Sequence, residues 1–179
     1  MLRRVRARFS DARARRRLSP TARGVLRERL TYLSAEKLAN LEWCADAHER
    51  YAVFAAGDAT DIGGDPYYGY VDDLYERVVA SFRAHGVAPG DRVRLHRGLF
   101  EDTLRPRGPL ALVHIDSDWY EPVRLCLERT DSHLSHGAFV VLDDYHDYDG
   151  CRAATDDFLR DHAELVPVRD RGNLVLQRR

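Results

Sequence analysis

Two stretches decide how this chain folds: "ALVHIDSDWYEPV" at residues 111–123 and "AFVVLDDYHDYDG" at residues 138–150. Each opens with an apolar run of four or five residues, typical of a buried strand, and each run ends abruptly in aspartates. Apolar residues at helical spacing between them predict a helix over residues 121–134. A strand, a helix and a strand of these lengths predict a crossover that joins two parallel strands, over residues 110–116 and 138–143.

The same alternation continues towards the C-terminus. Residues 150–162 predict a further helix, and short apolar segments at residues 165–168 and 174–177, linked by "RDRGN", predict an antiparallel hairpin at the sheet edge. Upstream of the first stretch, residues 71–84 predict a helix and residues 92–97 a strand. Strands that alternate with helices predict an α/β fold whose sheet is mostly parallel and ends in an antiparallel C-terminal hairpin.

The first third of the chain is less regular. Residues 30–44 carry apolar side chains at helical spacing, and Ser34 stands where an N-cap is expected. The stretch "GDATDIGGDPYYGY" at residues 57–70 is dense in Gly, Asp and Tyr, which predicts a loop. Residues 1–30 are rich in arginine and predict a basic, solvated helical segment, followed by one domain over residues 31–179.

The composition excludes several classes of protein. With 44% hydrophobic and 32% charged residues, the chain has an ordinary soluble composition, and no apolar stretch approaches the ~20 residues of a membrane span. A net charge of −1 gives no overall attraction to nucleic acid. Cys44, Cys126 and Cys151 show no CxxC spacing, which favours reduced thiols and a cytoplasmic location. The sequence leaves a homo-oligomer open.

The aspartates at the two strand ends form the first candidate site. Parallel neighbours end at the same edge of a sheet, ~5 Å apart, so Asp116 is expected opposite Asp143 and Asp144. Three carboxylates at this spacing need a compensating cation, and oxygen ligands favour Mg²⁺, or Mn²⁺ at a looser site. The alternative is that each acidic run caps a helix, because Asp is a preferred N-cap residue. Two such runs on consecutive strands favour the metal site.

Longer motifs extend this pattern. An I-D-x-D-x-Y strand end is followed by V-x-x-D-D-Y and then by G-C-R-x-A-x-D-D-F, all within residues 110–162. These residues resemble the C-terminal half of the macrocin O-methyltransferase family, of the TylF, MycF and NovP type, and the similarity extends upstream to residue 30. The resemblance implies a Rossmann-like methyltransferase sheet. It also implies an enzyme that uses S-adenosylmethionine (SAM) and Mg²⁺ to methylate a sugar hydroxyl of a small, glycosylated antibiotic.

The resemblance assigns roles to residues at the strand ends. It implies that Asp116, Asp143 and Asp144 bind the metal and that Asp116 is the catalytic base. The turn at the adenine side of the cofactor is implied to consist of Gly98, Leu99 and Phe100.

The resemblance also implies a mobile lid over the acceptor, at residues 57–70. Three tyrosines of this segment are expected to stack on the sugar or the aglycone, or else to pack within their own loop: Tyr67, Tyr68 and Tyr70. His146 follows the aspartate pair and either reaches the substrate or is solvated.

One expected part of a SAM-binding domain is missing. The Gly-rich turn after the first strand, and the acid that ends the second strand, should lie near residues 47–48, yet the leading helix runs directly into the lid segment. An alternative makes "YAVFAAGDATDIGGD" at residues 51–65 the first strand and turn, but its glycines lack the G-x-G spacing. We therefore expect a sheet without its usual first two strands, in a partial class I methyltransferase domain that binds SAM weakly.

Three functions stay open from the sequence. The first is a SAM-dependent and Mg²⁺-dependent sugar O-methyltransferase, active in a shortened form. The second is a non-catalytic remnant, or a partner of an intact subunit, that keeps the metal-binding edge. The third is a metal-dependent phosphohydrolase that uses the same acids. The third is disfavoured because the chain has no phosphate-binding Gly loop and a single lysine, Lys37.

Overall fold

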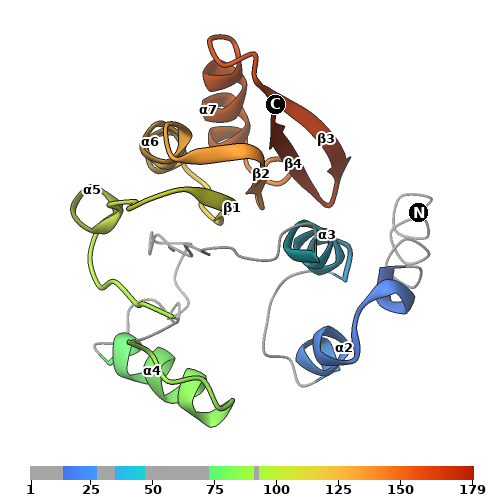
Figure 1. The fold of residues 1–179 in the computed structure, drawn as a ribbon, viewed down its shortest axis with the longest axis vertical. Helices are drawn as coiled ribbons and strands as arrows, with labels where there is room; N and C mark the ends of the chain where they lie inside the picture. Colours follow the sequence, from blue (N-terminus) through green and yellow to red (C-terminus); the bar gives the residue numbers. More distant parts are fainter. Residues whose placement is uncertain (1–13, 28–34, 47–72, 91–92) are drawn as a thin grey trace.

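The computed structural model describes residues 14–27, 35–46, 73–90 and 93–179. Its strands form one mixed, four-stranded sheet in the order β1-β2-β4-β3 (Figure 1). In chain order the elements are α2 (Pro20–Arg27), α3 (Ala35–Asp46), α4 (Leu74–Ala84), α5 (Phe100–Thr103), β1 (Leu110–Ile115), α6 (Tyr120–Asp131), β2 (Leu134–Leu142), α7 (Asp149–Leu159), β3 (Leu165–Arg171) and β4 (Asn173–Arg178).

β1 and β2 are parallel neighbours, and α6 forms the crossover between them. β4 pairs antiparallel with β2 and with β3, so the sheet has one parallel pairing and two antiparallel pairings. Gly172 has a φ of 78°, in the left-handed region, which suits glycine in the tight turn between β3 and β4. The α/β class, the parallel pair and the antiparallel C-terminal hairpin are therefore confirmed. The prediction of a mostly parallel sheet is wrong for the described residues, because β4 inserts antiparallel between β2 and β3.

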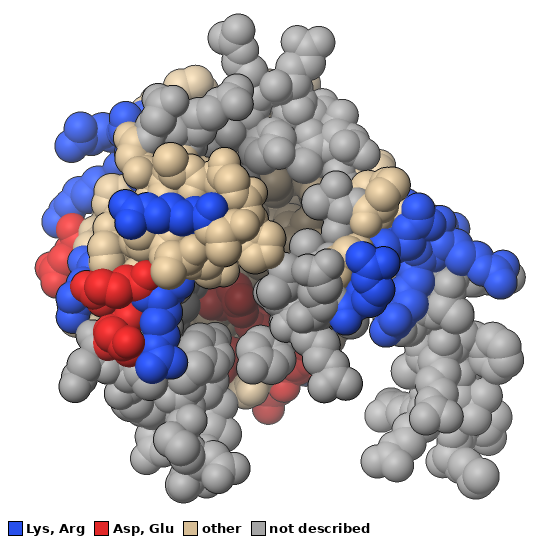
Figure 2. All heavy atoms as spheres, turned by 90° about the horizontal axis from the view of Figure 1, so that it is seen from below, with Lys and Arg blue, Asp and Glu red and all other residues tan. Residues whose placement is uncertain are grey.

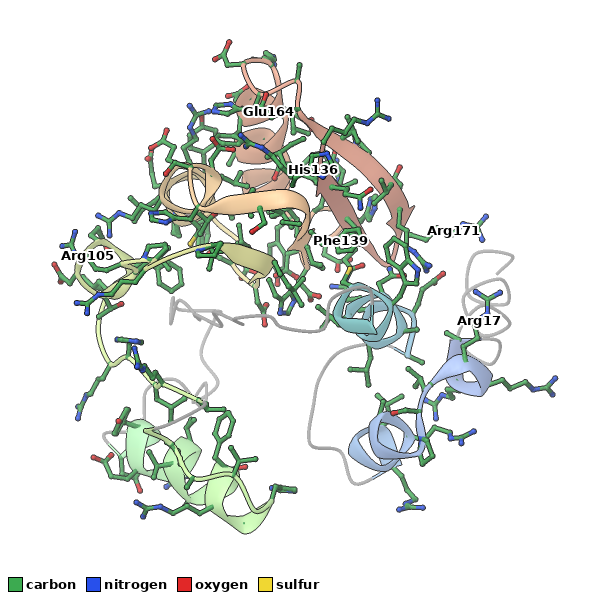
Figure 3. All side chains as sticks on the ribbon, in the orientation of Figure 1. Arg17, Arg105, His136, Phe139, Glu164 and Arg171 are labelled. Atoms are coloured by element: carbon green, nitrogen blue, oxygen red, sulfur yellow. The ribbon has the colours of Figure 1, made fainter. Side chains whose placement is uncertain are left out.

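The two faces of the sheet carry different helices: α6 and α7 cover one face, and α3 covers the opposite face (Figure 1). Alternate residues of β2 supply the two cores, because successive side chains of a strand point to opposite faces. Val140 and Leu142 join the cluster under α6 and α7, whereas Val141 joins the cluster that contains Cys44 of α3. Phe139 belongs to the second cluster and lies between the sheet and α3 (Figure 3).

The segment before β1 differs from its prediction. Residues 93–97 form no strand, and Val93 makes only an isolated bridge with Pro89. Val93 and Leu95 alternate as a strand requires, but no described strand pairs with them beyond this bridge. A strand without a neighbour leaves its backbone hydrogen-bonding groups unsatisfied, so the alternation alone does not produce one.

Other predicted boundaries shift by a few residues, as expected for helix and strand ends. β2 begins at Leu134, earlier than residue 138, and α7 ends at Leu159, earlier than residue 162. Ser34 and residues 47–72, which include the predicted lid, lie outside the described residues. The division at residue 30 stays a prediction. None of the helices in the described ranges combines the length and the apolar character that a membrane crossing requires.

Candidate metal centre at the ends of β1 and β2

Three aspartates meet where β1 and β2 end. Asp116 directly follows β1, and Asp143 and Asp144 directly follow β2. The backbone N–H of Asp143 donates a 2.9 Å hydrogen bond to the carbonyl of Ile115, which extends the parallel ladder past the ends of both strands. Each aspartate offers one carboxylate oxygen to a group whose members lie within 4.8 Å of one another. Asp143 and Asp144 are buried, whereas Asp116 is exposed.

A short loop, residues 143–148, leads from the aspartate pair into α7. Arg152 holds this loop, because its Nε donates to the carbonyl of Tyr145 at 3.1 Å and its Nη2 to the carbonyl of His146 at 3.3 Å. Gly150 packs tightly against the loop after β1: a Cβ at this position would lie 2.7 Å from the carbonyl oxygen of Asp118. Glycine therefore permits the start of α7 to approach the loop that carries Asp116.

A fourth charged side chain, Lys37 of α3, lies in this cluster. Its Nζ donates to Asp143 Oδ2 at 2.9 Å and to Asp147 Oδ2 at 3.0 Å, and it lies 3.7 Å from Asp144 Oδ1. Lys37 and Asp143 are both largely buried, with side-chain exposures of 12% and 5%. Acidic atoms lie recessed near the middle of the face in Figure 2, while most Lys and Arg atoms gather towards its two sides. The cluster thus supplies its own cation.

Polar contacts around Asn40 dock α3 on the sheet and so bring Lys37 to the aspartates. The Nδ2 of Asn40 donates to Asn173 Oδ1 at 2.7 Å and to the carbonyl of Arg171 at 3.0 Å. Arg169 donates to Asn40 Oδ1 at 3.2 Å, and its guanidinium lies 3.8 Å from the ring centroid of Trp43. Arg171 stands at the end of the hairpin near α3 (Figure 3).

The pKa values of Asp143 and Asp144 shift in opposite directions. Burial would raise the pKa of Asp143, but hydrogen bonds with His114 and Lys37 outweigh burial, and this pKa is lowered. Burial and the adjacent Asp143 carboxylate raise the pKa of Asp144 to about 7, with a partial offset from Lys37. Burial would lower the pKa of Lys37, yet its contacts with Asp143, Asp147 and Asp144 raise it. Asp143 and Lys37 therefore form a charged pair inside the cluster.

The arrangement of oxygens suits a hard divalent cation. At the Mg²⁺–oxygen distance of about 2.0–2.1 Å, one ion can contact two oxygens that are at most about 4.2 Å apart. The oxygens of Asp116, Asp143 and Asp144 lie within 4.8 Å of one another, so small side-chain rotations would bring all three to one ion. The donor set consists of carboxylates, as Mg²⁺ and Mn²⁺ prefer. The residues present therefore fit the metal that the sequence suggests.

The structure places the other predicted site residues less closely together. The Nε2 of His146 lies 2.9 Å from Asp170 Oδ1 on β3, so its ring is turned towards the hairpin. Gly98 has a φ of 136°, Leu99 is 63% exposed, and Phe100 is buried in the cluster under α6 and α7. The three tyrosines of the predicted lid lie outside the described residues: Tyr67, Tyr68 and Tyr70. The roles of all these residues in binding the substrate or the cofactor stay predictions.

Two residues of the cluster were not predicted from the sequence, namely His114 and Lys37. His114 stands within β1, and its Nε2 lies 3.3 Å from Asp143 Oδ1. For Lys37 a signal existed: Lys37, Asn40 and Cys44 recur at positions i, i+3 and i+7, so they share one face of a helix. The two polar residues on that face indicate that it meets polar partners on the sheet.

With this geometry established, comparison with known proteins identifies the family. The family described as Macrocin-O-methyltransferase (TylF) matches residues 27–170, a range that includes the three aspartates and Lys37. The chain belongs to the macrocin O-methyltransferase family. The resemblance expected from the strand-end motifs is thereby confirmed.

Two O-methyltransferases from Streptomyces match parts of the chain. An 8-demethyl-8-(2,3-dimethoxy-alpha-L-rhamnosyl)-tetracenomycin-C 4'-O-methyltransferase of Streptomyces olivaceus is 42% identical over 85 residues, which cover 46% of this chain and 32% of that protein. Demethyldecarbamoylnovobiocin O-methyltransferase of Streptomyces niveus is 32% identical over 107 residues, which cover 58% of this chain and 40% of that protein. The chain thus spans less than half the length of both relatives.

A solved structure supports the same assignment of fold. The O-methyltransferase NovP superposes with a TM-score of 0.54 and 26% sequence identity, over 80% of this chain and 64% of the NovP chain. The methyltransferase-like sheet expected from the sequence is therefore confirmed for the part of the fold that the two proteins share.

Proposed function

We propose that this chain is a sugar O-methyltransferase that acts on a glycosylated secondary metabolite, with SAM as methyl donor and a divalent cation at Asp116, Asp143 and Asp144. The observation that carries the proposal is the convergence of these carboxylates at the ends of β1 and β2 in a member of the macrocin O-methyltransferase family. The two curated relatives are both O-methyltransferases, and the name of one specifies a rhamnosyl-bearing compound.

The aspartates of the cluster differ in burial, and their burial determines the role that we assign to each. When bound, the cation would lower the pKa of a sugar hydroxyl that coordinates it. Asp116 is the exposed member of the three, so its carboxylate is placed to accept the hydroxyl proton from an acceptor that arrives from solvent. Asp143 is buried, and before a cation binds His114 and Lys37 hold its carboxylate charged and oriented. Once the sugar hydroxyl has lost its proton, its oxygen would be able to take the methyl group from SAM, with S-adenosylhomocysteine as the leaving group.

The metal site is tested by thermal unfolding in the presence of Mg²⁺ or Mn²⁺. At 100 times the Kd, a ligand that binds only the folded state adds about 2.7 kcal/mol, which corresponds to about 5–11 °C in Tm for a chain of this size. We expect this rise in the wild type and its loss in Asp143→Asn. Asp161→Asn is the matched control, because Asp161 is exposed beyond the C-terminal end of α7. An equal rise in Asp143→Asn and the wild type would exclude the site.

SAM binding separates an active enzyme from a non-catalytic remnant, the second candidate, which is favoured because the sequence lacks the expected Gly-rich turn. Without that turn and the ribose-binding acid, the loss is on the order of 4 kcal/mol, enough to turn a micromolar site into a near-millimolar one. We expect calorimetric titration with S-adenosylhomocysteine to give such weak binding. A Kd in the low micromolar range would show that the chain builds the cofactor pocket by another route.

A further inference from the structure

Lys37 stands where a metal ion would have to bind. Its Nζ contacts Asp143 Oδ2 at 2.9 Å and lies 3.7 Å from Asp144 Oδ1, so it lies close to two of the three candidate metal ligands. The ligand oxygens span at most 4.8 Å, which leaves little room for a second cation between them. An ammonium nitrogen and a divalent ion that shared the Asp143 oxygens would lie within about 4–5 Å of each other and repel.

We propose that Lys37 is the resident counter-ion of the three-aspartate cluster and that a divalent cation binds by displacing its ammonium group from Asp143 and Asp144. The proposal rests on the metal site of the proposed function. Lys37 is then a positioning residue. It neutralises the aspartates in the metal-free protein, keeps them together, and sets how tightly the cation binds.

The structure offers the displaced ammonium a second partner. Asp147 lies 3.0 Å from Lys37 Nζ through its Oδ2, is not one of the three clustered ligands, and has a side chain that is 56% exposed. Asp147 therefore stands at the rim of the cluster, whereas Asp143 stands inside it. A rotation of the lysine side chain can leave Asp143 to the metal and keep the ion pair with Asp147.

The backbone of Lys37 does not have to move for this exchange. Asn40, one turn further along α3, is fixed by its hydrogen bonds to Asn173 and to the carbonyl of Arg171. At the β3–β4 turn, a Cβ on Gly172 would lie 3.4 Å from the backbone nitrogen of Lys37, so α3 is closely packed there. The exchange is thus confined to the lysine side chain, which has four rotatable bonds and three donor hydrogens.

The first test measures Mn²⁺ affinity by calorimetry in the wild type, Lys37→Gln and Lys37→Arg. Lys37→Gln removes the competing charge, so we expect its Kd for Mn²⁺ to fall about tenfold, equivalent to about 1.4 kcal/mol. Lys37→Arg keeps a cation in place and should bind Mn²⁺ no more tightly than the wild type. Arg178→Gln is the matched control, because it removes a half-buried cation that pairs with Asp131 rather than with the cluster. Its Kd should not change.

The Kd values for Mn²⁺ distinguish the displacement of Lys37 from a purely structural role of this lysine. A tighter Kd in Lys37→Gln alone supports the proposal, since a purely structural lysine would weaken the site when removed. Equal or weaker binding in Lys37→Gln overturns the proposal and leaves the metal site intact. If neither the wild type nor Lys37→Gln binds Mn²⁺, the metal site of the proposed function is wrong, and the proposed displacement of Lys37 is overturned with it.

A second measurement needs no variant and covers the case in which Lys37→Gln does not fold. Lys37 is the only lysine, so a protein made with ¹⁵N-labelled lysine shows a single side-chain ammonium signal in NMR spectra. We expect saturating Mg²⁺, which is diamagnetic, to move this signal or to broaden it as the ammonium exchanges faster with water. A signal that keeps its position and width at saturation would overturn the displacement.

Discussion

The two faces of the sheet are held by different kinds of contact. On one face, α6 and α7 bury an apolar cluster in which Val123, Leu127 and Phe158 are no more than 1% exposed. On the other face, α3 contributes a smaller apolar cluster around Cys44 and a set of hydrogen bonds around Asn40. Apolar area is the main stabilising factor on the first face, whereas directional polar contacts determine how the helix sits on the second.

This difference explains why the positively charged residue of the site, Lys37, comes from α3. Apolar burial is non-directional, so it tolerates small rotations of a helix, whereas hydrogen bonds require a defined geometry. The contacts of Asn40 with Arg169, Arg171 and Asn173 set the rotation of α3 on the hairpin. Lys37 stands three residues before Asn40 and therefore reaches Asp143. The face covered by α3, which is the less apolar one, therefore places the Lys37 ammonium group beside the aspartates.

The largest expected effect falls on the face covered by α6 and α7. Phe158 is 1% exposed, and its ring stacks on His162 with centroids 3.7 Å apart. We expect Phe158→Ala to lower the free energy of unfolding by about 3–5 kcal/mol, because it removes apolar contacts and leaves a cavity. Urea unfolding followed by circular dichroism measures this loss. Val168→Ala, at a site on β3 that is 39% exposed, is the control and should change it by less than about 0.5 kcal/mol.

A loss below about 1 kcal/mol for Phe158→Ala would reverse the comparison. It would mean that the cluster under α6 and α7 is not the main source of stability and that the polar face carries a larger share.

The same contrast separates what the sequence could predict from what it could not. The strands of the C-terminal half follow from apolar runs, and the helices between them from their spacing, because these patterns are local. The edge that carries Asp116 and Asp143 follows from two adjacent parallel strands, a rule of topology. Of the strand predicted at residues 92–97, the described residues 93–97 form none, since a strand depends on a neighbour that its own sequence does not encode.

The place of Lys37 could not be derived in the same way. Its contact with Asp143 joins residues 106 positions apart. The contact depends on how α3 rotates on the sheet, and hydrogen bonds between Asn40 and the hairpin set that rotation. The shared helix face of Lys37 and Asn40 indicates polar partners, but no local pattern in the sequence identifies which residues those partners are. His114 was missed for another reason, since a histidine inside a strand of apolar neighbours reads as a core residue.

The second prediction concerns the polar contacts of α3. Asn40→Ala removes the donor to Asn173 Oδ1 and to the carbonyl of Arg171, and Asn173 is fully buried. We expect a loss of about 2 kcal/mol in the free energy of unfolding, because a buried acceptor loses its partner. Urea unfolding gives the value. The comparison would be weakened by a loss under about 0.5 kcal/mol, which is typical of a surface substitution.

A double-mutant cycle sharpens this prediction. If Asn40 and Asn173 act as a pair, the double variant Asn40→Ala with Asn173→Ala should lose less than the sum of the single losses, by about 0.5–3 kcal/mol. Additive losses would show that the two side chains contribute independently and that their 2.7 Å hydrogen bond does not dock α3.

The smallest expected effect is a difference in local opening between the two faces. Burial raises the pKa of Cys44, Cys126 and Cys151 to about 12, with a partial offset from Arg169 at Cys44, so none of these thiols should react readily at pH 8 in the folded protein. They then react through transient opening, and opening is easiest where few apolar contacts are lost.

Cys44 belongs to α3 and lies in the smaller cluster, while Cys126 and Cys151 lie in the larger cluster under α6 and α7. We expect a thiol reagent to label Cys44 about ten times faster than the other two, equivalent to about 1.4 kcal/mol in opening free energy. Peptide mass spectrometry at urea concentrations below the unfolding transition resolves the three rates. Equal rates at all three cysteines would mean that the faces open together, in one cooperative unit, and faster labelling of Cys126 or Cys151 would mean that α3 is the more firmly held helix.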